Sequence, residues 1–391
     1  MYKCKTLAAL VATALLATVG AASAQTAVTG GGASLPADLY KGSSDSILPA
    51  NFSYAVTGSG TGKKAFLENN AALFSTTGTV HFAGSDSVLS LTELNTYNST
   101  YNVSGDANRY GPLIQVPSVA TSVTIPFNKA GSAVDLSVTQ ICGIFSGKIT
   151  NWNQVSSDRT GAIQVVYRPE SSGTSELLTR FLTAACQNTD VAGTTLKLTG
   201  GVPKFSVQST FANLFVNNTV PGNFLQATAT GGTALYNTVY AADGRIGYVG
   251  PDVIPSLTDA TKVAKVKGKS PDEVSVLATL DTIDPPTGDA ALDPANWVPV
   301  FGNPSEGYPI AGYTNLVLGQ CYKNATVASN LRTFLLSHYS SAGGSNTAIR
   351  AHGFIPLTQA WRDAIRNRFV LAGSSAGLNN PGACGSIGRP L

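Results

Sequence analysis

The sequence predicts a fold built of α/β layers, and three observations support this prediction. Short β-rich runs alternate along the chain with stretches whose apolar residues recur at helical spacing. Of the 391 residues, 43% are hydrophobic and 12% are charged, a balance that suits a folded globular chain better than a disordered one. Several of the β-rich runs pass directly into a helix start through a turn of Gly, Ser and Thr. Because one hydrophobic core seldom serves so long a chain, we expect two domains.

Residues 1–24 are expected to be a signal peptide that is removed on export. Lys3 and Lys5 form a short basic region, an apolar run follows, and Ala-Ser-Ala at residues 22–24 has the small-x-small pattern of a signal peptidase site. No later stretch approaches the roughly 18 consecutive apolar residues that a membrane helix requires. We therefore expect an exported, soluble protein whose mature chain begins near Gln25.

The charge of the mature chain gives no sign of a nucleic-acid partner. The leader holds two of the 25 basic residues and no acidic residue, so 23 basic residues remain against 22 acidic residues, with no block of Lys and Arg. A DNA-binding protein concentrates positive charge on one face. The run GSGTGKK is not a nucleotide-binding P-loop either, because a P-loop needs a Gly one residue before Gly58 and a Ser or Thr in place of Lys64.

The strands expected along the chain are short. They are predicted, in chain order, at residues 52–56, 80–83, 122–127, 163–167 and 246–249. Residues 251–307 differ in character, because they are rich in Pro, Asp and Gly. We expect this stretch to form loops and irregular crossings.

Two helices follow from the spacing of apolar residues. In residues 174–186 and in residues 135–146 the apolar side chains recur at helical spacing. Within the first turn of the second helix, Ser137 and Gln140 have the separation of a capping box. Gly147 can end that helix.

The four cysteines that follow the leader are expected to form two disulfides. An even number of cysteines in an exported chain favours disulfides, although four cysteines allow three pairings. Pairing neighbours, Cys142 with Cys186 and Cys321 with Cys384, keeps each bridge within one half of the chain. Each bridge would then contribute about 4 kcal/mol by the chain-entropy estimate. Metal ligation is the alternative, but no Cys-x-x-Cys or Cys/His cluster supports it.

Four segments lead from a β-rich run through a polar turn into a helix start. They are GGGASLPADLY at residues 30–40, YAVTGSGTGKKAFLEN at 54–69, VHFAGSDSVLSLTEL at 80–94 and YRPESSGTSELLTRFL at 167–182. Unpaired N–H groups at a helix start can hold an anion, and in open α/β sheets ligands gather where such turns meet. Taken singly, each turn has the simpler explanation of an ordinary helix cap. Together with a lone arginine, Arg168, and a lone aspartate, Asp86, the turns indicate an anion site.

A set of segments, in order over nearly the whole chain after the leader, carries a family resemblance. They are GGGASLP, TGSGTGKKAFLEN, FAGSDSVLS, QVPSVATSVTIPFNKAG, CGIFSGKITNW, VVYRPESSGTSELLTRFL, GRIGYV and YPIAGYTNLVLGQCY. They resemble the periplasmic phosphate-binding proteins of the ABC phosphate-uptake system, most closely the branch called DING proteins. That branch is named for an N-terminal Asp-Ile-Asn-Gly, whereas here Ala27, Val28 and Thr29 precede Gly30.

The resemblance implies the type II periplasmic binding protein fold. In this fold two α/β lobes are joined by two crossing strands, and the ligand lies in the cleft between the lobes. The first crossing would fall in residues 115–121 and the return in residues 307–314. Lobe I would then comprise residues 25–116 plus 309–391, and lobe II residues 117–308. The pairing of neighbouring cysteines puts one disulfide in each lobe.

The resemblance also implies the residues that bind inorganic phosphate. Leu35 and Gly173 would act through backbone N–H groups, the serines and the threonine also through hydroxyls, and Arg168 would supply the full positive charge. The implied set is Ser34, Leu35, Ser59, Asp86, Arg168, Ser172, Gly173 and Thr174. No catalytic residue, metal or cofactor is expected.

The resemblance further implies how the protein would be used. The partner would be an ABC phosphate permease in the membrane, to which a monomer would present its phosphate. Arsenate would be a mimic of the ligand. The location would be the periplasm, with secretion to the extracellular space as the alternative.

Asp86 bears on which anion the site accepts. A carboxylate repels a bound anion unless that anion carries a proton that the carboxylate can accept. Phosphate near neutral pH still has an O–H group, and sulfate has none. Asp86 is therefore expected to discriminate against sulfate.

Other interpretations remain open. Arg168 and Asp86 could form a structural ion pair with no ligand. A secreted phosphatase is the main competing function, although the sequence shows no Asp/His metal cluster and no G-x-S-x-G motif, and an adhesin or matrix protein could use the same scaffold. His81, His338 and His352 are scattered and are more simply surface or packing residues than metal ligands.

Overall fold

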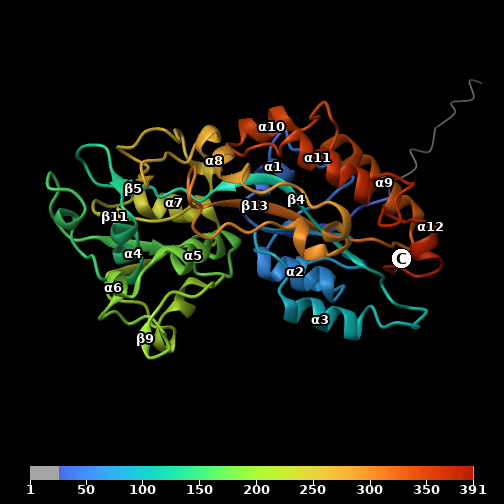
Figure 1. Ribbon diagram of the computed structural model, residues 1–391, viewed down its shortest axis with the longest axis horizontal. Helices are drawn as coiled ribbons and strands as arrows, with labels where there is room; N and C mark the ends of the chain where they lie inside the picture. The colour runs from blue at the N-terminus through green and yellow to red at the C-terminus, as the bar shows by residue number, and fades with distance from the viewer. Residues whose placement is uncertain (1–25, 391) are drawn as a thin grey trace, which may run out of the picture.

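The computed structural model describes residues 26–390, and this part of the chain forms two α/β lobes side by side (Figure 1). One lobe contains a five-stranded sheet and the other a four-stranded sheet. The fold class predicted from the sequence is thereby confirmed. The expected signal peptide, residues 1–24, lies outside the described residues.

The five-stranded sheet has the strand order β2-β1-β3-β13-β4. Its strands are β1 (Gly30–Gly32), β2 (Ala55–Val56), β3 (Phe82–Ser85), β4 (Leu113–Ser122) and β13 (Ala311–Gly319). β1 pairs in parallel with β2 and β3, and β13 pairs antiparallel with β3 and β4. The glycines of β1 let a helix approach closely, because a Cβ atom on Gly62 of α2 (Ser59–Leu67) would lie 2.3 Å from the Cα atom of Gly32.

The four-stranded sheet has the strand order β10-β7-β11-β5. Its strands are β5 (Phe127–Asn128), β7 (Gln164–Tyr167), β10 (Phe224–Gln226) and β11 (Arg245–Ile246). β7 pairs in parallel with β10 and β11, and β5 runs antiparallel to β11. Two small pairs complete the strands, namely β6 (Asp135–Leu136) with β12 (Lys265–Val266), and β8 (Leu198–Thr199) with β9 (Val202–Pro203).

Helices cover both sheets (Figure 1). The lobe with the five-stranded sheet carries α1 (Ala37–Lys41), α2, α3 (Leu91–Thr100), α9 (Ala325–His338), α10 (Asn346–Ala351), α11 (Gln359–Ile365) and α12 (Pro381–Cys384). The other lobe carries α4 (Val138–Ser146), α5 (Gly173–Ala185), α6 (Asn188–Val191) and α7 (Gly232–Tyr240), and α8 (Glu273–Leu280) packs near β13. No helix within residues 26–390 is both long and apolar enough to cross a lipid bilayer.

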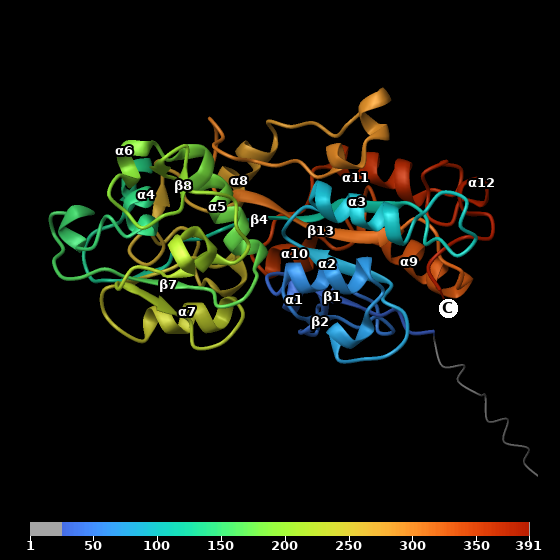
Figure 2. The same cartoon turned by 90° about the horizontal axis from the view of Figure 1, so that it is seen from below.

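Two long neighbouring strands, β4 and β13, connect the lobes. Figure 2 shows them running together between the two halves of the molecule. After β4 ends at Ser122 the chain enters the second sheet at Phe127, and it returns to the first sheet at Ala311. The division into residues 25–116 plus 309–391 and residues 117–308 stays a prediction.

The strand prediction is confirmed at residues 163–167 and is only partly right at the other positions. Residues 163–167 contain β7, and of residues 80–83 only the last two belong to β3. Of residues 52–56 only the last two form β2, and of residues 246–249 only the first belongs to β11. Residues 122–127 pair mainly through isolated bridges, because successive residues pair with different segments, Thr124 with Val249 and Pro126 with Val263.

The helix over residues 174–186 is present as α5, whereas the helix expected over residues 135–146 begins only at Val138. Its first two expected residues form β6 instead, because they pair with β12. The cap is as predicted. Ser137 and Gln140 form a capping box, and Gly147 ends the helix with a φ of 80°.

The expectation of loops throughout residues 251–307 is wrong, because this stretch contains β12 and α8. Asp272 caps α8 by accepting a hydrogen bond from the Ser275 N–H group at 2.9 Å. Val276 and Leu280, one turn apart, are buried. One buried face and a cap were enough to form a helix despite the surrounding Pro, Asp and Gly residues.

Both disulfides have the pairing that the sequence analysis favoured. Cys142–Cys186 joins α4 to the end of α5, and Cys321–Cys384 joins the segment after β13 to α12. Each bridge therefore ties two elements of one lobe together.

We expect that replacing both Cys142 and Cys186 by alanine lowers the free energy of unfolding by about 4 kcal/mol, because the bridge closes a long loop in the unfolded chain. Urea denaturation of the variant and the native protein measures the difference. The matched variant without Cys321 and Cys384 should lose slightly more, since its sequence separation is 63 residues rather than 44. A loss below about 1 kcal/mol in both variants would contradict this account.

Candidate functional site

Three polar turns of the first lobe, each at the end of a strand and here called corners, meet at one edge of its sheet. Ser34 follows β1, Ser59 begins α2 just after β2, and Asp86 follows β3 directly. Because β2, β1 and β3 are parallel neighbours, their carboxyl ends lie at the same edge. Gly58 makes the turn before α2 with a φ of 87°, which favours glycine.

The second lobe contributes a fourth corner, which lies between β7 and α5. Arg168 follows β7, and its Nη2 atom donates a hydrogen bond to the Ser34 hydroxyl at 2.8 Å. Gly173 begins α5, and a Cβ atom on it would lie 2.3 Å from the Cβ atom of Asp86 and 2.7 Å from the Ser59 hydroxyl. The two lobes are therefore closed against each other at this place.

The residues expected to bind the ligand converge on these corners. Most of them are buried, and Ser34 is half-buried. The Thr174 hydroxyl is buried with no hydrogen-bond partner, whereas the Ser172 hydroxyl accepts a hydrogen bond from the Ser175 N–H group at 3.4 Å. The Leu35 side chain packs near Gly250 of the second lobe. That these residues bind phosphate stays a prediction.

Asp86 is a buried carboxylate with hydroxyl groups on both oxygens. Thr314 donates to its Oδ1 atom at 2.5 Å, and the Ser59 hydroxyl lies 3.4 Å from its Oδ2 atom. Burial raises the pKa of Asp86 from 3.8 to about 6, while the Thr314 hydroxyl and the charge of Arg168 oppose this rise. Asp86 is therefore ionised at neutral pH by a narrow margin.

Arg168 is held by a carboxylate that sequence reasoning missed. The guanidinium forms an ion pair with Glu170, whose Oε1 atom also accepts from the Arg168 Nε atom at 2.6 Å and from the Gly231 N–H group at 2.9 Å. Among residues 26–390 the ion pair of Arg168 is thus with Glu170 and not with Asp86. The alternative of a structural pair between Arg168 and Asp86 is therefore wrong. Glu170 stands two residues after Arg168, but no pattern in the sequence marked it.

Two further residues near the site were also missed. Thr314 lies on β13, far from Asp86 in sequence, and no local motif singles it out. Asp252 lies in a short helical turn after β11, and burial raises its pKa to about 7, with Asp38 and Asp86 adding to the rise. An acidic residue in a Pro- and Gly-rich stretch gave no signal of its position.

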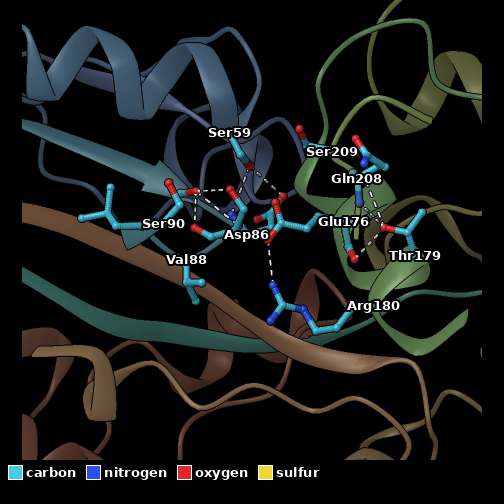
Figure 3. A network of polar contacts seen from close by, with 12 residues as sticks. Ser59, Asp86, Val88, Ser90, Glu176, Thr179, Arg180, Gln208 and Ser209 are labelled. Carbon is cyan, nitrogen blue, oxygen red and sulfur yellow. Dashed lines mark hydrogen bonds and ion pairs between the residues drawn. The ribbon is translucent and has the colours of Figure 1, made fainter. Parts of the chain in front are cut away.

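A network of polar side chains flanks the corners on both lobes. Figure 3 shows Ser59, Asp86 and Ser90 of the first lobe on one side and Glu176 and Arg180 of α5 on the other, with Thr179 directed at Gln208. Glu176 of α5 is paired with Arg180, and burial raises its pKa against the lowering effect of Arg180 and Lys63. Lys63 of α2 is itself paired with Glu93.

Within residues 26–390 no group of three or more His, Cys, Asp or Glu side chains could hold a metal ion. His81 accepts a hydrogen bond from the Thr29 N–H group, and His338 bonds Ser118 and Ser345. Burial lowers the pKa of both imidazoles to about 4. His352 lies beside Asp45 at the surface. The histidines act here as packing and hydrogen-bonding residues.

Comparisons with known proteins agree with the fold of the chain. A family model described as a PBP superfamily domain matches residues 17–338. The chain is 48% identical over 397 aligned positions to a Pseudomonas aeruginosa protein named alkaline phosphatase L, with both chains covered in full.

Two solved structures are similar to the chain over nearly all of its length. A phosphate-binding protein from Stenotrophomonas maltophilia is 79% identical, with a TM-score of 0.90, and the match covers 94% of this chain and 100% of that one. A structure described as a high affinity periplasmic phosphate-binding protein bound with phosphate, PfluDING, is 42% identical, with a TM-score of 0.83 and the same coverage.

The raised pKa of Asp86 predicts that pH controls closure of the ligand-free lobes. A carboxyl group whose pKa is raised in the closed form favours closure below its ordinary pKa, and this contribution is lost as the pH rises through about 6. Relative to its value at low pH, the free energy of closure should therefore be less favourable above about pH 7 by at most about 3 kcal/mol, since one pKa unit corresponds to about 1.4 kcal/mol.

We therefore expect ligand-free Asp86→Asn protein to be more compact than the ligand-free native protein above about pH 7, and the two to match below about pH 4. Small-angle X-ray scattering measures this as the radius of gyration. Asp284→Asn, which changes an exposed carboxylate, is the control and should behave as the native protein does. Equal radii for Asp86→Asn and native protein at every pH would refute the prediction.

Proposed function

Because the chain belongs to the PBP superfamily, and within it to the phosphate-binding proteins that include the DING branch, we propose that it captures inorganic phosphate between its lobes and presents it to an ABC permease. The binding residues would be Ser34, Leu35, Ser59, Asp86, Arg168, Ser172, Gly173 and Thr174. Arsenate would bind as a mimic, and the protein would act as a monomer.

The observation that carries this proposal is the convergence of unpaired donors on a buried guanidinium. Arg168 is 1% exposed and reaches Ser34 on the opposite lobe. The first N–H groups of α2 and α5 have no partners within their helices, and the Thr174 hydroxyl is buried without one. Such donors suit a small oxyanion with several acceptor atoms.

Asp86 supports phosphate over sulfate as the ligand. Its oxygens already accept from hydroxyl groups, so an ionised Asp86 can take one more proton donor but repels a fully ionised anion. Hydrogen phosphate offers a proton, and sulfate offers none. The carboxylate therefore supports a site for a protonated oxyanion.

The structure also supports a place of action outside the cytoplasm. The chain has two disulfides. Disulfides persist in oxidising compartments and are rare in the cytosol. We place the protein in the periplasm, where phosphate must be collected before it reaches a membrane permease. Closure of the lobes would tell the permease that phosphate is bound.

A phosphomonoesterase is the second candidate, because a relative that is 48% identical is named alkaline phosphatase L. Gly173 lies so near Asp86 and Ser59 that the lobes leave little space for the leaving group of an ester. Hydrolysis of an ester would then have to occur while the lobes are open. We rank this function below binding for that reason.

Calorimetry of refolded, phosphate-free protein tests the proposed function. Phosphate should bind with a Kd in the micromolar range or below, about −8 kcal/mol, and sulfate should not bind at neutral pH. Arg168→Lys keeps the charge but loses the planar fork, and we expect it to weaken phosphate binding by at least about 30-fold.

In the same titrations, the Asp86→Asn variant should show a smaller difference in affinity between phosphate and sulfate, since the neutral amide no longer repels a fully ionised anion. Native protein that binds neither anion would overturn the proposed function. An Asp86→Asn variant that still excludes sulfate would overturn the role of the carboxylate alone.

Turnover of p-nitrophenyl phosphate distinguishes the second candidate from the first. We expect purified protein to show no hydrolysis that depends on this site. Hydrolysis that disappears in both Arg168→Ala and Gly173→Ala, with contaminating phosphatases excluded, would favour the phosphatase instead. Hydrolysis that persists in both variants arises elsewhere and leaves the binding function in place.

A further inference from the structure

Thr314 makes the shortest contact to the Asp86 carboxylate that the structure records. Its hydroxyl donates to the Oδ1 atom at 2.5 Å, and both residues are buried. Ser59, on the other oxygen, is at 3.4 Å and also accepts from the Asp86 N–H group at 3.1 Å. Thr314 is therefore the main hydroxyl donor to this carboxylate.

The register of the sheet brings Thr314 to Asp86. β13 pairs antiparallel with β3, with Asn315 opposite Ser85, so the next step of the ladder places Thr314 level with Asp86. On its other side β13 pairs with β4, where Thr314 is opposite Val119 and Asn315 opposite Pro117.

That pairing skips Ser118, so β4 carries a bulge opposite Thr314. Bulges often stand beside functional sites, where they redirect a side chain. Helix α9 holds both residues of the bulge, because His338 bonds Ser118 and the Tyr339 hydroxyl donates to the Pro117 carbonyl oxygen at 2.7 Å. The bulge beside Thr314 is thus held by side chains at the end of α9.

We propose that Thr314 determines the specificity of the site by keeping Asp86 in the form that accepts a proton from the ligand. The proposal rests on the proposed function. A hydroxyl that donates to a carboxylate stabilises the ionised form, and an ionised carboxylate can only accept. Without Thr314, Asp86 would more often be protonated, would donate to the bound anion, and would no longer reject sulfate.

The electrostatic balance at Asp86 makes this donor decisive. Burial raises the pKa of Asp86 to about 6, and among the influences that lower it Thr314 is the largest, ahead of Arg168. Glu176 raises it further. The margin by which Asp86 stays ionised near neutral pH therefore depends on one hydroxyl group.

Other titratable groups interact with Asp86 from the elements packed around it. They are Tyr40 of α1, Tyr54 before β2, Arg168 after β7, Glu176 of α5 and Asp252 after β11. Burial raises the pKa of both tyrosines, so they stay neutral in the range that matters. Asp252 has a pKa of about 7 and titrates near Asp86, so the test must separate the two.

Sulfate is the probe of choice, because it carries no proton over the range from about pH 5 to pH 8, in which carboxyl groups such as Asp86 titrate. Its affinity for the native protein, measured by calorimetry, should rise as the pH falls through the pKa of Asp86. In Thr314→Val the midpoint of this rise should move upward by about one to two pH units, since a hydrogen bond to a charged group contributes about 1.5–3 kcal/mol.

Three comparisons isolate the role of Thr314. Thr314→Ser keeps the hydroxyl and should restore the native midpoint. Thr124→Val removes an equally buried hydroxyl that donates to the Val249 carbonyl oxygen, and it should leave the midpoint unchanged. The double variant with Asp252→Asn and Thr314→Val should still show the upward shift of the sulfate midpoint.

The outcomes separate this proposal from the function on which it rests. If native protein does not bind phosphate, the proposed function fails. If phosphate binds but Thr314→Val weakens both anions alike without moving the sulfate midpoint, Thr314 is only structural. Should Thr314→Val fail to fold, Thr314→Ala takes its place, and native protein that excludes sulfate even at about pH 5 overturns the proposal without any variant.

Discussion

Burial of the Asp86 carboxylate is the constraint on which the rest of the site depends. A charged carboxylate taken out of water is stable only when donors surround it, and here the donors come from elements distant in sequence. Parallel pairing of β2, β1 and β3 brings Ser34, Ser59 and Asp86 to one edge, and β13 supplies Thr314 from the other side. These elements of the five-stranded sheet thereby surround the Asp86 side chain.

The positive charge of the site lies on the other lobe. Arg168 is buried and paired with Glu170, whose Oε1 atom is also bonded by the Gly231 N–H group. A guanidinium that already has a carboxylate partner is neutralised without ligand, so lobe closure does not leave a bare positive charge in the interior. Its hydrogen bond to Ser34 places the guanidinium at the boundary between the lobes. Under the proposed function, an entering anion would meet a guanidinium that Glu170 and Ser34 already orient.

The sequence was enough to predict the features that depend on neighbours along the chain. The turns at Ser34, Ser59 and Gly173, the capping box at Ser137 and the α/β class follow from local patterns. Thr314 could not be found in this way, because its contact to Asp86 spans 228 residues and depends on strand register. The missed helix α8 and the misplaced start of α4 likewise reflect tertiary pairing that local composition does not reveal.

Under the proposed function, the glycines at the lobe boundary would couple ligand binding to closure of the lobes. Gly58 and Gly60 of the first lobe lie against Ser171 of the second, and Gly173 lies against Asp86, at distances where any side chain would collide. The backbones of the two lobes therefore approach each other directly where α2 and α5 begin. Under the proposed function, an anion larger than the space between two such backbones would hold the lobes apart, and a smaller one would leave donors unpaired. Closure of the lobes would thus select the anion by its size, charge and protonation together.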